Sequence, residues 1–319
     1  MGKQKQSGTA FEYAVLQAVS HCIGAANCQV LDSASTEGAA ASFHALDPER
    51  REDDILAGKA AAEMLLKFEP RLVLAALGRG AINLSIQSDQ AGGLGDVRDI
   101  LLSSEDGDWE IGISAKHQHE ALKHSRLSNK IDFGEKWLGF PCSQTYFDAI
   151  GPIFECLRDL KTKNLEWSTL PNKSVEIYQP LLNAFKNEVV FLESQRPGLV
   201  ASGLVSYLIG NKDFYKVIKL KRQTKVQVFN FNGTLNVGNR GVQPDLKLEK
   251  LKLPSRVVEI DFRRGQTEFS STTLDMICDA GWQLSFRLHN ASSKVEPSLK
   301  FDINLIGRPN NLQTFTSIW

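Results

Sequence analysis

Two short apolar segments with charged residues at their ends constrain this chain more than any other feature. They lie in residues 95–128, which read GDVRDILLSSEDGDWEIGISAKHQHEALKHSRLS. The β-branched and apolar residues of both segments predict two strands, and the polar Asp/Gly segment between them predicts a turn that makes them neighbours. Because side chains alternate along a strand, Glu110, Ser114 and Lys116 are expected on one face of the second strand. Lys116 therefore ends a polar row.

The first of these strands is expected to hold two acids, Asp96 and Asp99. A carboxylate on one strand and a lysine at the end of its neighbour can share a divalent ion and an attacking water. The ion lowers the pKa of bound water and offsets the charge that builds on a phosphate, while the ammonium group orients the water. We expect Asp96 to bind the metal, with Asp99 as a helper, in phosphodiester hydrolysis. A strand that ends in a solvated lysine is the alternative that the spacing leaves open.

This segment resembles the PD-(D/E)xK pattern of nucleases, in which one acid is followed by a second acid, one further residue and a lysine. Asp96 matches the first acid and Lys116 the lysine, whereas Ser114 stands in the place of the second acid. In some restriction enzymes of this pattern the replaced acid has moved onto the following helix. The resemblance thus implies a Mg²⁺ site formed by Asp96 with Glu120, one helical turn after Lys116, or with Glu110, on the same strand face.

Four phrases spread along the chain resemble the type II restriction endonucleases of the HaeIII family. They are GTAFEYAVLQAV at 8–19, SAKHQHEALKHSRLS at 114–128, YLIGNKDFYKVI at 207–218 and SLKFDINLIGRP at 298–309. The resemblance implies an α/β fold with a restriction-endonuclease-like core, in which helices flank a mixed central sheet, and a β-rich C-terminal part. It also implies Mg²⁺-dependent cutting of double-stranded DNA at a palindrome, GGCC if the likeness extends to specificity. A homodimer follows, because a two-fold site suits a two-fold protein.

Basic and histidine side chains after Lys116 are candidates for DNA contacts. The residues that follow predict a helix rich in His, Lys and Glu, whose cationic groups could contact phosphates or bases beside the cleaved strand. A solvated helix face is the alternative. The candidate DNA-binding residues of this helix are His119, Lys123, His124 and Arg126.

A second basic run lies in the strand-rich region near residues 217–241. Residues 217–231 alternate apolar residues with basic or polar ones, and a glycine-rich loop follows. The basic residues are Lys219, Lys221, Arg222 and Lys225, and the loop holds Asn239 and Arg240. Asn and Arg are the residue types that read adenine and guanine edges in a major groove. A hairpin that presents these side chains to DNA is therefore one interpretation. A solvated edge hairpin, protected from aggregation by its lysines, is the other.

Composition limits the remaining function classes. Lysine plus arginine number 37 and aspartate plus glutamate also 37, so a DNA-binding protein of this kind must concentrate its positive charge locally. The five cysteines show no CxxC spacing, which argues against a zinc site or a disulfide framework and fits a reducing cytoplasm. No apolar stretch approaches the eighteen residues of a membrane span, and no Walker-type loop predicts a nucleotide cofactor.

The turn at residues 195–198 is the expected boundary between two domains. Before it, helical patterns dominate, and we expect a nuclease core with helical insertions over residues 1–196. After it, alternating strands dominate, and we expect a β-rich DNA-recognition region over 197–319, packed on the core. Two rival functions stay open: a catalytically inactive DNA-binding protein on a nuclease fold, and an α/β protein unrelated to nucleic acids.

Overall fold

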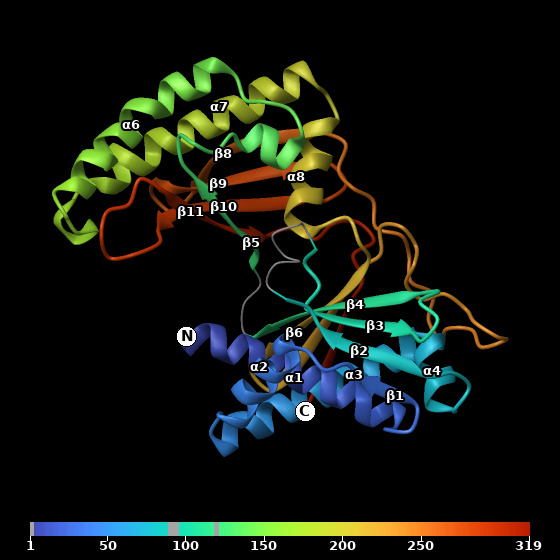
Figure 1. Cartoon of the computed structure of the whole chain (residues 1–319). Helices are drawn as coiled ribbons and strands as arrows, with labels where there is room; N and C mark the ends of the chain where they lie inside the picture. Colours follow the sequence, from blue (N-terminus) through green and yellow to red (C-terminus); the bar gives the residue numbers. More distant parts are fainter. Residues whose placement is uncertain (1–2, 89–95, 118–120) are drawn as a thin grey trace. The chain divides into compact units, whose positions relative to one another are not determined.

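The computed structural model describes residues 3–88, 96–117 and 121–319, which form a mixed α/β fold with two sheets (Figure 1). One sheet has seven strands of mixed direction and the other has five antiparallel strands. The expectation of a mixed central sheet flanked by helices is confirmed, as is the strand-rich character of the C-terminal part.

The chain folds into two compact units, and each unit is built from segments that are separate in the sequence. The first unit contains residues 1–120, 210–251 and 311–319, and the second contains residues 121–209 and 252–310. These units differ from the expected consecutive segments, 1–196 and 197–319. The difference arises because long-range strand pairing returns the chain to the first sheet twice, whereas the expected boundary rested on local composition.

The first unit holds the seven-stranded sheet, in the order β1-β2-β3-β4-β6-β7-β12. The pairs β1–β2 and β4–β6 are parallel, and the other neighbours are antiparallel. Its strands are β1 (Cys28–Val30), β2 (Ile82–Ile86), β3 (Ile100–Ser104), β4 (Glu110–His117), β6 (Phe214–Leu220), β7 (Gln223–Phe229) and β12 (Thr314–Ile318), and its helices are α1 (Lys3–Ile23), α2 (Ala34–His44), α3 (Pro48–Phe68) and α4 (Pro70–Ala76).

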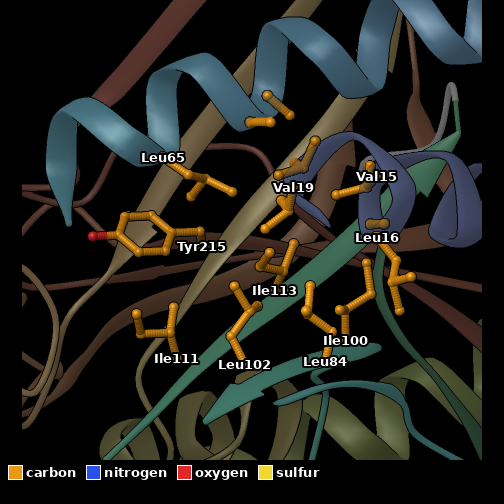
Figure 2. Packing of buried hydrophobic residues seen from close by; sticks show 14 of the residues in the cluster. Val15, Leu16, Val19, Leu65, Leu84, Ile100, Leu102, Ile111, Ile113 and Tyr215 are labelled. Carbon is orange, nitrogen blue, oxygen red and sulfur yellow. The ribbon is translucent and has the colours of Figure 1, made fainter. Parts of the chain in front are cut away.

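Helices α1 and α3 cover the apolar face of this sheet. Figure 2 shows Val19 of α1 and Leu65 of α3 packed over Ile113 of β4 and Leu102 of β3, all of them buried. Burying such side chains contributes roughly 1.5–3 kcal/mol each, so this cluster holds β3 and β4 firmly in place. The polar row of β4 points to the opposite face.

The first turn of helix α3 has the residues that favour the start of a helix. Asp47 caps its first turn by accepting a hydrogen bond from the Arg50 amide at 2.9 Å, and Pro48 occupies the first helical position. Its interior glycine, Gly58, allows a close crossing, because a Cβ there would lie 2.8 Å from the carbonyl oxygen of Ala14 in α1. Among the described helices, none is long and apolar enough to cross a membrane.

The second unit holds the five-stranded sheet, in the order β5-β11-β10-β9-β8, with helices packed against one face. Phe185 of α7 contacts Phe286 of β10 and Phe301 of β11, which forms the centre of this core. Its strands are β5 (Ala121–Leu127), β8 (Val257–Arg264), β9 (Phe269–Cys278), β10 (Gln283–Asn290) and β11 (Leu299–Leu305), and its main helices are α6 (Gln144–Thr162), α7 (Gln179–Gln195) and α8 (Leu199–Ile209).

The prediction of a helix after Lys116 is wrong. Strand β4 continues to His117, and residues 121–127 form strand β5, which pairs antiparallel with β11 so that Arg126 lies opposite Lys300. The polar sequence of this segment has a helical pattern, but pairing with a strand about 170 residues later decides its conformation. His119 and Glu120 lie outside the described residues, as do the side chains of Lys123 and His124.

Candidate active site

The end of β4 brings a lysine, a serine and an aspartate together. One carboxylate oxygen, Asp99 Oδ2, accepts hydrogen bonds from Lys116 Nζ at 2.9 Å, from Ser114 Oγ at 3.1 Å and from the Ala115 amide at 2.8 Å. The side chains of Lys116 and Asp99 are 29% and 22% exposed, so a substrate can reach both. Ser114, which stands where the nuclease pattern has its second acid, thus orients the Asp99 carboxylate through a hydrogen bond.

Asp99 reaches this position because its backbone extends the sheet just before β3 begins. The Asp99 amide donates to the Ile113 carbonyl of β4 at 2.8 Å, and the Gln87 amide donates to the Asp99 carbonyl at 2.9 Å. Hydrogen bonds to strands on both sides fix the backbone, so the carboxylate is held beside the last residues of β4.

Asp96, the acid expected to work with Lys116, is bound elsewhere. Both of its carboxylate oxygens accept from the Arg98 guanidinium, at 2.6–3.1 Å, and its Oδ1 also accepts from the Arg98 amide. The same guanidinium donates to Glu110 Oε1 at 2.8 Å. Lys116 thus contacts Asp99, the acid expected to help, and not Asp96, the acid expected to bind the metal.

The guanidinium of Arg98 also sets the charge state of these two acids. Burial acts to raise the pKa of Asp96 and of Glu110, but hydrogen bonds and attraction from Arg98 overcome it and hold both pKa values below their usual range. The Arg98 side chain is only 5% exposed and lies against the Cα of Gly112, where any Cβ would overlap it. Arg98, which the sequence did not single out, forms an ion network separate from Lys116.

Glu110 is too far from Lys116 to share a metal with it. The two residues are six positions apart on β4, which corresponds to roughly 20 Å along an extended strand. The other candidate for the third acid, Glu120, lies outside the described residues. Across the parts of the chain that the structure describes, no group of three or more His, Cys, Asp or Glu side chains is arranged to hold a metal ion.

Asp99 nevertheless offers the donor that a hard divalent ion needs. Its three hydrogen bonds all go to Oδ2, and within the described parts no hydrogen bond occupies Oδ1. Mg²⁺ is commonly bound by one or two carboxylates together with waters and substrate phosphate oxygens, so a single free carboxylate oxygen beside a lysine fits this ion.

A buried ion pair lies near the end of β4, on the face of the sheet that α3 covers. Asp54 of α3 accepts a hydrogen bond from Lys219 of β6 at 2.5 Å, with both side chains almost fully buried. Burial raises the pKa of Asp54, and Lys219 counters it. His117 lies nearby, and burial and then Lys219 lower its pKa. Lys219, part of the basic run in sequence, is therefore a core residue.

The predicted DNA-binding residues of the first unit fall at two ends of the sheet. Lys221 and Arg222 form the exposed turn between β6 and β7, and β6 is parallel to β4 with Lys219 beside His117. This turn therefore lies at the same end of the sheet as Lys116. Lys225 of β7 lies in register with Ile218 of β6, which is itself in register with Lys116.

Asn239 and Arg240 lie at the opposite end. They line a cavity of about 480 Å³ with Ile82 at the start of β2 and Ser104 at the end of β3, and Arg240 Nη1 donates to the Arg79 carbonyl at 3.0 Å. The expected hairpin is absent from this described loop, which contains only an isolated bridge from Asn239 to Val242. The structure therefore does not bring Asn239 and Arg240 to Lys116.

Arg126, the remaining predicted DNA contact with a described side chain, belongs to the second unit. It is exposed on β5 and donates to Ser298 Oγ at 3.3 Å. The backbones of Lys123 and His124 pair with Ile303 and Asp302 of β11.

Comparisons with known proteins show to which protein family this chain belongs. The family model described as HaeIII restriction endonuclease matches residues 8–309. The type II restriction enzyme HaeIII of Haemophilus aegyptius is similar, with 46% identity over 244 residues that cover 76% of each chain. No solved structure matches.

Proposed function

The chain belongs to the HaeIII restriction endonuclease family and is a type II site-specific nuclease of double-stranded DNA, in which we propose that Asp99 and Lys116 form the catalytic pair. The observation that carries the proposal is the contact between Lys116 Nζ and Asp99 Oδ2 at the end of β4. A partly exposed ammonium group beside a carboxylate can orient a water and stabilise the charge that builds on a phosphate during phosphodiester hydrolysis.

We propose that the metal is Mg²⁺, with Asp99 Oδ1 as a protein ligand. Bound there, the ion would lower the pKa of a water and offset negative charge on the scissile phosphate. Glu120 remains our proposal for a second carboxylate. Ser114 restrains the Asp99 carboxylate by donating to Oδ2, which leaves Oδ1 without a hydrogen bond among the described residues.

Lys116 acts directly on the reacting groups. Its ammonium group orients the attacking water and stabilises the charge of the pentavalent state. Because Asp99 neutralises Lys116 before substrate arrives, the site has no excess positive charge of its own at this point. The positive charge that attracts DNA must therefore come from other side chains, and Lys221 and Arg222 in the adjacent turn are proposed for that role.

We further propose a palindromic target, GGCC, cut by a homodimer in the cytoplasm. A two-fold enzyme places one site on each strand of a two-fold sequence. The five cysteines are all free thiols, in keeping with a reducing compartment. These proposals rest on the family to which the chain belongs.

Incubation of the purified chain with phage DNA, in Mg²⁺ or in EDTA, followed by sequencing of fragment ends, tests the function. Discrete fragments only with Mg²⁺, with every end located at a GGCC site, are expected. Binding without cleavage in several divalent metals would instead support an inactive DNA-binding protein, an alternative favoured by the serine at position 114.

A further inference from the structure

The five-stranded sheet of the second unit has one apolar and one polar face. Phe286 and Phe301 contact Phe185 of α7, with ring centroids 5.4 and 5.1 Å apart, so they face the helices. Because side chains alternate along a strand, the adjacent residues Arg287 and Lys300 point to the other face. Arg287 is exposed and Lys300 is half-buried.

Strand pairing aligns three basic residues across this polar face. Arg126 of β5 lies opposite Lys300 of β11, and Lys300 lies opposite His289 of β10. We call Arg126, Lys300 and His289 the basic row. Neighbouring strands are about 4.8 Å apart, so the basic row spans roughly 10 Å. Arg287 lies two residues before His289, on the same face.

Like charges directly opposite one another destabilise a sheet. Other cations of the second unit avoid such a cost through ion pairs, at 2.7 Å for Lys161–Glu296, 3.0 Å for Lys186–Asp261 and 2.8 Å for Arg263–Asp275. Within the described residues, by contrast, no ion pair joins an acid to Arg126, Lys300 or Arg287.

The polar contacts of the basic row are to neutral groups. Arg126 donates to Ser298 Oγ at 3.3 Å, and the His289 ring hydrogen-bonds the Asn290 carbonyl at 2.9 Å. Asp302 lies opposite Arg287 in the register, so this face also carries one carboxylate. No ion pair among the described residues neutralises Arg126 or Lys300 of the basic row, and an external anion would do so.

We propose that the basic row binds the phosphate backbone of the duplex DNA that this protein cuts. The inference rests on the proposed function, and it adds Lys300 and His289 to the DNA-contacting residues. Phosphates repeat every 3.4 Å of helix axis along each strand, so a row of roughly 10 Å can meet two or three of them. Backbone contacts fix the position of a protein on DNA without reading sequence.

The test measures affinity of the full-length protein for two duplexes without metal, one with GGCC and one without, over a range of salt concentrations. The variants are Arg126→Gln, Lys300→Gln and the double variant, and Lys161→Gln on α6 is the control. Each row variant should weaken binding to both duplexes by about five- to tenfold at 0.1 M salt and lower the salt slope by about one unit. The control should match the wild type.

The outcomes separate this inference from the proposed function. If the wild type binds and cuts DNA while the double variant keeps its affinity and salt slope, the basic row is not a DNA contact, although the function stands. Loss of binding only to the GGCC duplex would also contradict a backbone contact. A wild type that binds no duplex would contradict both proposals. Equal thermal unfolding temperatures would show that the variants are folded.

Discussion

The Arg98 side chain crosses β4 at Gly112, where any Cβ would overlap it, and reaches Asp96 on one side and Glu110 on the other. The absence of a side chain at position 112 is thus what allows one buried guanidinium to join two acids. The residue after Arg98 is Asp99, which contacts Lys116. The network consequently fixes the backbone next to the candidate catalytic pair.

Replacing Gly112 by alanine should destabilise the protein. The new Cβ forces Arg98 out of its place, and overpacking of this kind costs about 1–3 kcal/mol. Urea unfolding measures the loss. Gly8→Ala, in α1 of the same unit, is the control, because nothing lies within 4 Å of the added Cβ and alanine favours a helix. Equal stability of Gly112→Ala and the wild type would show that Arg98 moves without cost.

Acid should weaken the protein partly through Asp96 and Glu110. Their folded-state pKa values lie below the ordinary 3.8 and 4.5, so their stabilisation is complete above about pH 4.5 and is lost as pH falls through the depressed values. Thermal unfolding of wild type and Arg98→Met between pH 2 and pH 7 tests this. The difference in unfolding temperature should shrink below pH 4, and a constant difference would contradict the assignment.

The buried pair of Lys219 and Asp54 makes a prediction about stability rather than DNA binding. Lys219→Met leaves the buried Asp54 carboxyl without its ion-pair partner. Such a loss typically lowers the free energy of unfolding by about 3–5 kcal/mol. The double variant Lys219→Met with Asp54→Leu removes both charges and should recover much of that loss, as a denaturant-unfolding cycle would measure. If the single and double variants were equally unstable, the pair would not be coupled.

The sequence predicted the β3–β4 hairpin itself better than it predicted the contacts of the charged residues there. The β-branched segments and the polar turn were enough to place Lys116 at a strand end, because both signals are local. Which acid meets Lys116 was not predictable in this way. Asp96 and Asp99 differ by three positions, and only the course of Arg98 over Gly112 shows that Asp96 is already bound.

Non-local pairing explains the other differences. Residues 121–127 are a strand because β11 pairs with them, and the two compact units alternate along the chain because β6, β7 and β12 return to the first sheet. Lys219 reads as part of a basic surface run, but its register beside His117 turns it toward Asp54 in α3. No local pattern contains this information.

The turn between β6 and β7 should contribute to DNA affinity more than the loop at the other end of the sheet. Lys221→Gln with Arg222→Gln is expected to weaken duplex binding and to lower its salt slope by about two units, since two phosphate contacts are lost. Arg240→Gln is the comparison, because Arg240 lies at the other strand ends and already donates to Arg79. A larger effect of Arg240→Gln in a binding titration would reverse this assignment.

Cleavage by three single variants tests the central claim most directly. Asp99→Asn and Asp96→Asn are compared with the wild type on GGCC-containing DNA in Mg²⁺, with duplex binding measured in parallel to confirm folding. Asp99→Asn should cut at least about 10²-fold more slowly while still binding DNA, as should Lys116→Ala, because each removes a group that acts on the transition state. Asp96→Asn should lose stability but retain cutting; an inactive Asp96→Asn beside an active Asp99→Asn would contradict the account.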